Sequence, residues 1–171
     1  TLNPDIWQHF TFADPQSHGA ICVLPIFSDL PTGLDYLTLG EALTAGTLTI
    51  TEITESGSVP ELTVVNDGDL PVLLLDGEEL VGAKQNRILN VTVLASAHST
   101  VVIPVSCVEA GRWHHLSAEF APSDRAHFAT GRAAKAASVT ESLRRDRSRR
   151  SDQAAVWEDI ALKTERMGAE S

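Results

Sequence analysis

The chain has 171 residues, of which 43% are apolar and 21% are charged, and its formal net charge is −10. These proportions are typical of one globular domain with a core, and no apolar run approaches the ~18 residues of a membrane helix. The acidic balance disfavours non-specific nucleic-acid binding. Cys22 and Cys107 are too few for a disulfide framework, so we expect a reduced, cytoplasmic compartment.

The first third of the chain predicts an arm, a buried strand and a short helix. Residues 1–18 are aromatic and polar, which indicates an arm or first strand that packs on the body. The apolar run 19–27 is typical of a buried strand. Thr38 and Glu41 have the spacing of a capping box, so a helix of about two turns is expected before Gly46.

Five strands are predicted in the middle of the chain, from alternating or continuous apolar patterns. They cover residues 47–54, 61–66, 71–75, 88–95 and 100–108. The sequence Asn66-Asp67-Gly68-Asp69 predicts a hairpin turn between the second and the third. Pro104 has no N–H to donate, which favours an edge or a bulge. Short strands joined by Gly, Asp and Asn turns, without a β-α-β rhythm, predict a mainly antiparallel β sandwich or open barrel.

The last third predicts a pair of helices. Residues 130–147 are rich in Ala, Ser and Arg, and residues 151–167 form a second helix with Ser151 as its N-cap. The side chains expected on its buried face are Trp157, Ile160, Thr164 and Met167. The predicted fold class is therefore α+β. A β-rich body over residues 1–120 carries one short helix. A helical extension over residues 121–171 packs on the body or on a second subunit, within a single domain overall.

The distribution of charge gives the strongest functional lead. Residues 1–110 carry 14 acidic residues and only two basic ones, Lys84 and Arg87. Solubility does not require this pair in a chain with a net negative charge. Either a structural carboxylate or an anionic ligand is therefore expected beside it. Glu78 and Glu79 precede the pair in the same segment, so carboxylates, amides and cations converge there.

Three stretches carry a resemblance to a known family. They are Leu-Asp-Gly-Glu-Glu-Leu-Val-Gly-Ala-Lys-Gln-Asn-Arg-Ile-Leu-Asn ending at Asn90, Ile-Pro-Val-Ser-Cys-Val-Glu-Ala-Gly-Arg-Trp ending at Trp113, and Tyr-Leu-Thr-Leu-Gly-Glu-Ala-Leu ending at Leu43. From about Gly19 to Glu170 the chain resembles the bacterial ARG (ADP-ribosylglycohydrolase) and rhodanese-phosphatase-superfamily-associated protein domain family, whose function is unassigned. The resemblance implies an association with enzymes of ADP-ribose and phosphate chemistry, and it supplies no activity. It also implies that family members continue beyond the last residue of this chain.

The first functional hypothesis is a site for an anionic small molecule, for which the resemblance favours a nucleotide- or ADP-ribose-like ligand. Ammonium, guanidinium and amide groups suit phosphates and hydroxyls. The predicted ligand-binding residues are Lys84, Gln85, Asn86, Arg87, Glu109, Arg112 and Trp113. Glu78 or Glu79 is the predicted general base if the ligand is hydrolysed. The sequence assigns no metal ligands and no particular cofactor.

The second hypothesis is a non-catalytic structural or oligomerisation module. Lys84 and Arg87 would then be buried against Glu78, Glu79 or Glu109 as an internal salt-bridge network, and no cleft would remain. The basic helices would dock on an acidic face to form a homo-oligomer. Under this hypothesis, replacing Arg87 by alanine would unfold the protein.

Two further groups receive weaker interpretations. Cys107 with His114 and His115 invites a thiolate or metal site, although the apolar strand around Cys107 favours a buried thiol. Residues 144–150 contain five arginines, which could contact phosphate or RNA. Such a run is more often a solvated helix end, here with an acidic surface of the same or a second subunit as its partner. The isolated histidines receive no role: His9, His18, His98 and His127.

Overall fold

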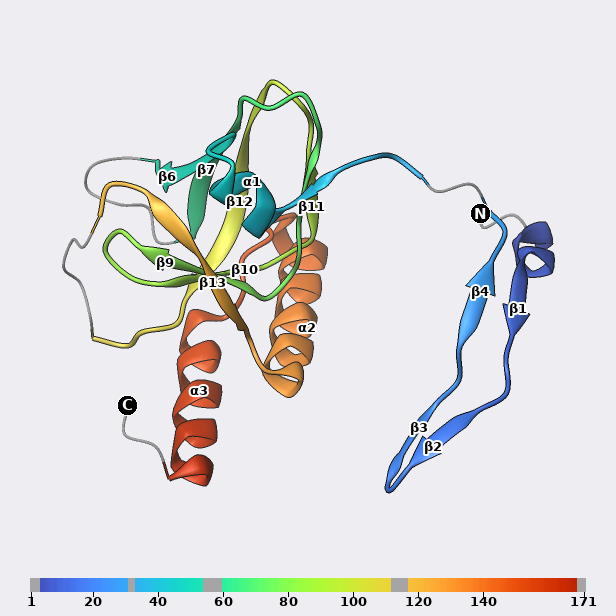
Figure 1. Cartoon of the computed structure of the whole chain (residues 1–171). Coiled ribbons are helices and arrows are strands. Elements are labelled where there is room, and N and C mark those ends of the chain that lie inside the picture. The colour runs from blue at the N-terminus through green and yellow to red at the C-terminus, as the bar shows by residue number, and fades with distance from the viewer. Residues whose placement is uncertain (1–3, 31–32, 54–59, 112–116, 169–171) are drawn as a thin grey trace. The chain divides into compact units, whose positions relative to one another are not determined.

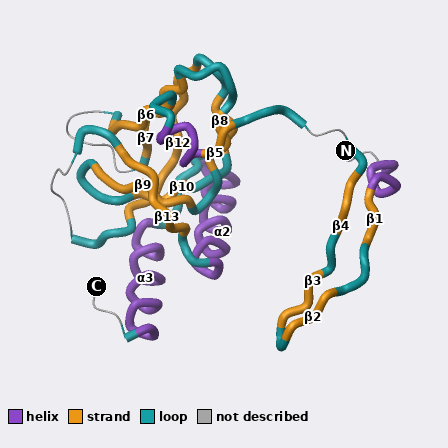
Figure 2. Tube along the Cα trace, viewed as in Figure 1, coloured by secondary structure: helices purple, strands orange, loops and turns teal. Residues whose placement is uncertain are grey.

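The computed structural model describes residues 4–30, 33–53, 60–111 and 117–168 (Figure 1). The chain divides into two compact units, Thr1–Leu34 and Asp35–Ser171. Figure 2 shows that the first consists of a helical turn and strands, and that the second contains all three α-helices. Each unit is built from its own set of hydrogen-bonded strands.

The first unit is a two-stranded ribbon. After a 3-10 helix (Pro4–His9), β1 (Phe10–Phe12) pairs with β4 (Ile26–Ser28), and β2 (Gln16–His18) pairs with β3 (Ile21–Val23). The prediction of one buried strand over residues 19–27 is wrong. Pro25 cannot donate to a ladder and separates two short strands, β3 and β4, whose side chains are exposed within this ribbon.

The second unit is organised around a six-stranded antiparallel sheet. In spatial order its strands are β13 (Phe120–Ala126), β9 (Glu78–Gly82), β10 (Arg87–Leu89), β12 (Ser99–Cys107), β7 (Glu61–Asn66) and β6 (Leu48–Glu52). A bridge between Thr51 and Glu119 joins the two ends of the order, so the sheet curls into a half-barrel. The predicted α+β class with an antiparallel open barrel is confirmed.

A smaller sheet and a short helix cover one end of the half-barrel. β8 (Val72–Leu74) lies between β11 (Val93–Ala95) and the parallel strand β5 (Leu37–Thr38). α1 (Leu39–Thr44) follows β5 directly, and the predicted capping box is present. The Thr38 backbone N–H donates to Glu41 Oε2 over 2.8 Å, and Thr38 Oγ1 accepts from the Glu41 N–H over 3.4 Å. These bonds satisfy donors that a helix start leaves open.

Two strand predictions are corrected by the pairing. The expected hairpin at residues 66–69 does not form, because β7 pairs with β6 and β12 whereas β8 belongs to the smaller sheet. The side chain of the buried Asn66 instead donates to the carbonyls of Leu70 and Ser96, both over 2.9 Å. The predicted strand 88–95 divides into β10 and β11, which lie in different sheets. Both predictions came from local sequence patterns, whereas the strand with which each segment pairs depends on residues that are distant in sequence.

Pro104 lies in the central strand β12 and not at an edge of the sheet. The pairing of β12 with β7 ends at Pro104, and its pairing with β10 begins at Val105. The missing N–H therefore falls where β12 changes from one partner strand to the other. The ladder is interrupted there, as it is at a bulge, so no hydrogen bond from this position is needed.

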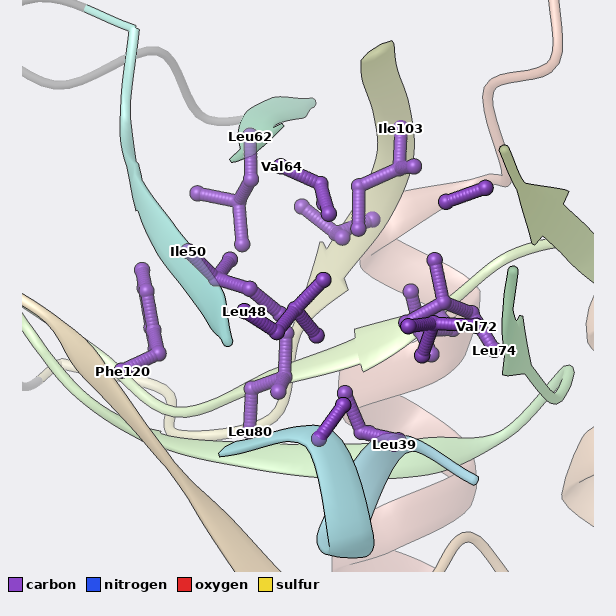
Figure 3. Packing of buried hydrophobic residues seen from close by; sticks show 14 of the residues in the cluster. Leu39, Leu48, Ile50, Leu62, Val64, Val72, Leu74, Leu80, Ile103 and Phe120 are labelled. Carbon is purple, nitrogen blue, oxygen red and sulfur yellow. The ribbon is translucent and has the colours of Figure 1, made fainter. Parts of the chain in front are cut away.

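The core lies inside the half-barrel and under α1. The labelled side chains of Figure 3 point toward one another from the two sheets and from the helix: Leu39, Leu48, Ile50, Leu62, Val64, Val72, Leu74, Leu80, Ile103 and Phe120. Most of them alternate with more exposed residues along their strands. Burial of each such side chain stabilises the fold by about 1.5–3 kcal/mol.

Two helices follow the sheet and lie beside the half-barrel in Figure 1: α2 (Ala129–Asp146) and α3 (Gln153–Met167). The N-cap of α3 is Asp152, whose side chain accepts from two backbone N–H groups, because the predicted cap Ser151 bonds instead to Ser106. Val156 is its buried residue, whereas Met167 is 68% exposed. No helix in the described part of the chain has both the length and the apolar character to cross a membrane.

Candidate functional site

Arg87 lies in the interior of the half-barrel, where its side chain is 0% exposed. In β10 it stands opposite Leu80 on one side and Cys107 on the other. One terminal nitrogen donates to Glu52 Oε1 over 3.2 Å. The other donates to Gln85 Oε1 over 3.1 Å and to Cys107 Sγ. The cation is therefore held by a carboxylate and two further acceptors inside the protein.

The carboxylate that pairs with Arg87 was missed by the sequence analysis, which expected Glu78, Glu79 or Glu109. Glu52 belongs to β6, which is separated from β10 in the sheet by β12 and β7. A signal was nevertheless present. Glu52 has the same parity along its strand as the buried residues Leu48 and Ile50, so alternation places it on the core face.

The remaining polar residues of the segment form an internal network. The Asn86 N–H donates to Glu109 Oε2 over 2.8 Å, and Gln85 Nε2 donates to the Glu109 carbonyl over 2.7 Å. Asn86 Nδ2 donates to Glu79 Oε1 over 3.3 Å. Lys84 is half-buried. These bonds bring together four of the predicted site residues besides Arg87: Glu79, Gln85, Asn86 and Glu109.

Glu78 and Glu79 point to opposite faces of β9, as neighbours on a strand must. Glu78 accepts from the Leu75 N–H over 2.7 Å, and its partial burial raises the pKa of its carboxyl. Glu79 stands opposite Ile88 on the outer face. A register shift in β13 between Pro122 and Ala126 accompanies a bond from Ser123 Oγ to Glu79 Oε2, 3.1 Å long. Two donors therefore hold the Glu79 carboxylate.

A hollow of about 570 Å³ opens beside Glu79, between the outer face of the sheet and α3. We call it the α3 hollow. Its lining comes from the sheet, from the connection to α2 and from α3: Glu79, Ile88, Val108, Arg125, Ala126, His127, Phe128, Ile160, Lys163, Thr164 and Met167. Of these residues only Glu79 is a site residue predicted from the sequence, since the others come from segments that are distant from it along the chain.

His127 is the most unusual group of the α3 hollow. Its ring lies 4.6 Å from that of Phe128, between centroids. Burial, and secondly the Lys135 ammonium, lower the pKa of the imidazole, while Asp159 and Asp76 act in the opposite direction. Its Nε2 is buried beside Gly131 of α2 and makes no hydrogen bond to any residue that the structure describes. Because its pKa is lowered, the imidazole is neutral at pH 7.

The lowered pKa of His127 predicts a loss of stability in mild acid. Below about pH 6.5 the imidazole is protonated in the unfolded chain but remains neutral to a lower pH in the folded protein. The free energy of unfolding therefore decreases as the pH is lowered. His127→Gln removes this contribution. We expect the stability of the wild type relative to this variant to fall between about pH 7.5 and about pH 5.5 in urea unfolding. A difference that stays constant over this range would contradict the assignment.

Cys107 has the surroundings of a structural thiol. It is 1% exposed, and burial raises its pKa even though the Arg87 guanidinium opposes the effect. A protonated thiol is a poor nucleophile. His114 and His115, which the sequence analysis paired with it, lie outside the described residues, as do the predicted ligand-binding residues Arg112 and Trp113.

The α3 hollow combines groups that suit an anionic ligand with a flat ring. Arg125 and Lys163 are exposed cations, and Lys163 Nζ lies 5.8 Å from the centroid of the Phe128 ring. A fixed carboxylate and a neutral imidazole provide an acceptor and a proton-transfer group. Across the described ranges, no group of three or more His, Cys, Asp or Glu side chains is placed to hold a metal ion.

Comparison with known proteins gives one family. No curated protein and no solved structure matches the chain. The sequence profile of one family matches residues 9–171, which include both sheets of the second unit, the α3 hollow and the Arg87 network. The chain therefore belongs to the ARG and Rhodanese-Phosphatase-superfamily-associated Protein domain family.

Proposed function

We propose that this domain binds a small anionic, nucleotide-like molecule in the α3 hollow. The observation that carries the proposal is the convergence of Glu79, His127, Arg125 and Lys163 on one hollow of about 570 Å³, within the range of small-molecule sites. Within the Glu78–Arg87 segment, Glu79 is the residue that lines the hollow and would contact the ligand. Asn86 fixes that carboxylate, while Arg87 holds the interior of the sheet behind it.

The chemistry of the lining favours the ligand class. Arg125 and Lys163 can pair with phosphate oxygens. Phe128 and the exposed thioether of Met167 offer apolar surface to a base. The family name associates these domains with ADP-ribosylglycohydrolases and phosphatases, and an ADP-ribose-like ligand agrees with that association. If the ligand is hydrolysed, Glu79 is the general base that takes a proton from the attacking water, because Glu78 lies on the other face.

Ligand-induced thermal stabilisation tests this proposal, with ADP-ribose, NAD, AMP and phosphate as probes. A ligand at ~100 times its dissociation constant should stabilise the wild type by about 2.7 kcal/mol. We expect Lys163→Ala to lose this stabilisation, because it removes a cation that pairs with phosphate oxygens. Arg166→Ala is the matched control, because Arg166 is an exposed cation of α3 that does not line the hollow.

Two outcomes would contradict the proposal. One is the absence of stabilisation by any of the four probes. The other is a ligand effect that is equally large in Lys163→Ala and in Arg166→Ala. The second result would show that the ligand binds elsewhere on this acidic chain, since both variants remove one exposed positive charge from the same helix.

A second candidate function is a non-catalytic structural or oligomerisation module. The specific observation in its favour is the burial of Arg87 against Glu52, which places the guanidinium inside the fold and away from solvent. In this proposal the domain assembles into a homo-oligomer. Sedimentation at increasing protein concentration tests it. A species that remains monomeric at every concentration would exclude self-association as the function.

A further inference from the structure

Five arginines surround the turn between α2 and α3: Arg144, Arg145, Arg147, Arg149 and Arg150. We call this segment, residues 144–150, the arginine corner. All five side chains are exposed. In the described parts of the chain, the ion pair that involves them joins Arg145 to its neighbour Asp146 over 3.3 Å. Exposed neighbours of this kind contribute little to stability, so the fold does not account for the run.

The backbone at the arginine corner and just after it is fixed by hydrogen bonds to the sheet and to α2. Asn90 Nδ2 donates to the Arg149 carbonyl over 3.3 Å. Ser151 bonds to the buried Ser106, and the Asp152 N–H donates to Ser138 Oγ over 2.7 Å. The arginine stems therefore project from an ordered turn, which reduces the entropy that a partner must supply on binding.

Two neighbouring hollows flank this turn and share Ser148 and Arg150. The first, about 460 Å³, is lined by Ser138, Glu141, Ser142, Arg145, Asp146, Ser148, Arg150, Ser151 and Asp152. The second, about 360 Å³, is lined by Glu61, Val102, Pro104, Leu143, Arg147, Ser148, Arg149 and Arg150. Because both hollows border Ser148 and Arg150, they are adjacent, and an occupant that reaches both must be extended.

The floor of the second hollow is apolar. Val102 is 55% exposed and Leu143 is 40% exposed, and Pro104 of β12 lines the hollow with them. Exposed apolar residues rimmed by arginine are characteristic of protein interfaces. The first hollow adds hydroxyls and three carboxylates, which can accept hydrogen bonds from backbone N–H groups. No aromatic residue lines either hollow for base stacking, which disfavours single-stranded nucleic acid as the occupant.

We propose that the arginine corner docks an extended acidic peptide segment of a partner protein, in which Asp or Glu alternates with apolar residues. Carboxylates of the segment pair with Arg147, Arg149 and Arg150. Its apolar side chains cover Val102 and Leu143. The contact is local, because salt screens charges over about 8–10 Å, so the net negative charge of the chain does not prevent it.

Fluorescence anisotropy with a labelled synthetic peptide of alternating Asp and Leu tests the proposal. We expect saturable binding that weakens with added salt. The double variant Arg149→Ala/Arg150→Ala should weaken it by about tenfold or more. Arg144→Ala/Arg166→Ala is the matched control, since it removes two exposed arginines that line neither hollow. Val102→Thr, which keeps a β-branched strand residue, should weaken peptide binding through the apolar floor alone.

Several results would overturn this inference. They are an absence of peptide binding, equal loss in the corner and control variants, and tighter binding of a single-stranded oligonucleotide or of inorganic pyrophosphate than of the peptide. Circular dichroism of each variant identifies any loss of fold. These outcomes are separate from those for the α3 hollow, because neither Arg149 nor Arg150 lines that hollow.

Discussion

Replacing Arg87 by alanine is expected to remove about 3–5 kcal/mol from the free energy of unfolding. The guanidinium is fully buried, and its loss leaves the carboxylate of Glu52, only 12% exposed, without the cation that compensates for its burial. Glu52 Oε2 already makes no hydrogen bond to a described residue. Since domains of this kind are stable by about 5–15 kcal/mol, urea unfolding should reveal a marginal or unfolded variant.

A double variant separates the charge from the packing. Arg87→Met/Glu52→Leu removes both charges and retains side-chain volume, so it should recover much of the stability that Arg87→Ala loses. Arg87→Lys keeps the charge but not the planar fork that reaches Glu52, Gln85 and Cys107 together, so it should remain destabilised. Wild-type stability in Arg87→Ala would show that the network is dispensable, and would return Arg87 to consideration as a ligand-binding residue.

Replacing Asp76 by alanine is expected to produce a loss of similar size, about 3–5 kcal/mol. Asp76 accepts a hydrogen bond from the ammonium of Lys135, an α2 side chain that is 0% exposed and also donates to the Leu89 carbonyl. Without Asp76 the ammonium is buried with a neutral acceptor alone. The reverse change, Lys135→Met, should cost less, because Asp76 is 22% exposed and lies 3.6 Å from Arg132 Nε.

The pH dependence checks the same pair. Burial lowers the pKa of Lys135, although the bond to Asp76 opposes the effect. A cation whose pKa is lower in the folded state binds fewer protons there, so stability rises with pH between that pKa and about 10.4. In Asp76→Ala this rise in stability should begin at a lower pH.

The comparison of the two variants by urea unfolding can contradict this account. It would do so if Lys135→Met lost more stability than Asp76→Ala.

Side-chain hydrogen bonds hold the two C-terminal helices to the sheet of the second unit. Lys135 anchors α2 to β10 and to Asp76, and Gln153 anchors α3 by exchanging two hydrogen bonds of 2.8 Å with the backbone of Cys107. The α3 hollow is lined by the sheet and by α3. Loss of the Gln153 anchor, which holds α3 to the sheet, is therefore expected to weaken ligand binding there.

Patterns within a few residues determined much of this fold. The capping box at Thr38 and Glu41 and the alternation over residues 48–52 and 61–66 were visible in the sequence, because capping and strand amphipathicity depend on near neighbours. The family was recognisable too, since a long motif such as Asp76–Asn90 is specific by itself. The sequence also indicated that Lys84 and Arg87 needed a local explanation, although it could not choose between a ligand and a carboxylate.

Only the tertiary structure decided which groups meet. Glu52 reaches Arg87 because the sheet curls, and the α3 hollow exists because α3 returns to the outer face beside Glu79. Residues 88–95 alternate as one strand would, yet Asn90 bonds to Ser106 and to the α2–α3 turn, and the chain there passes from one sheet to another. Such contacts join residues far apart in sequence, and their energies depend on burial and distance, which no local pattern encodes.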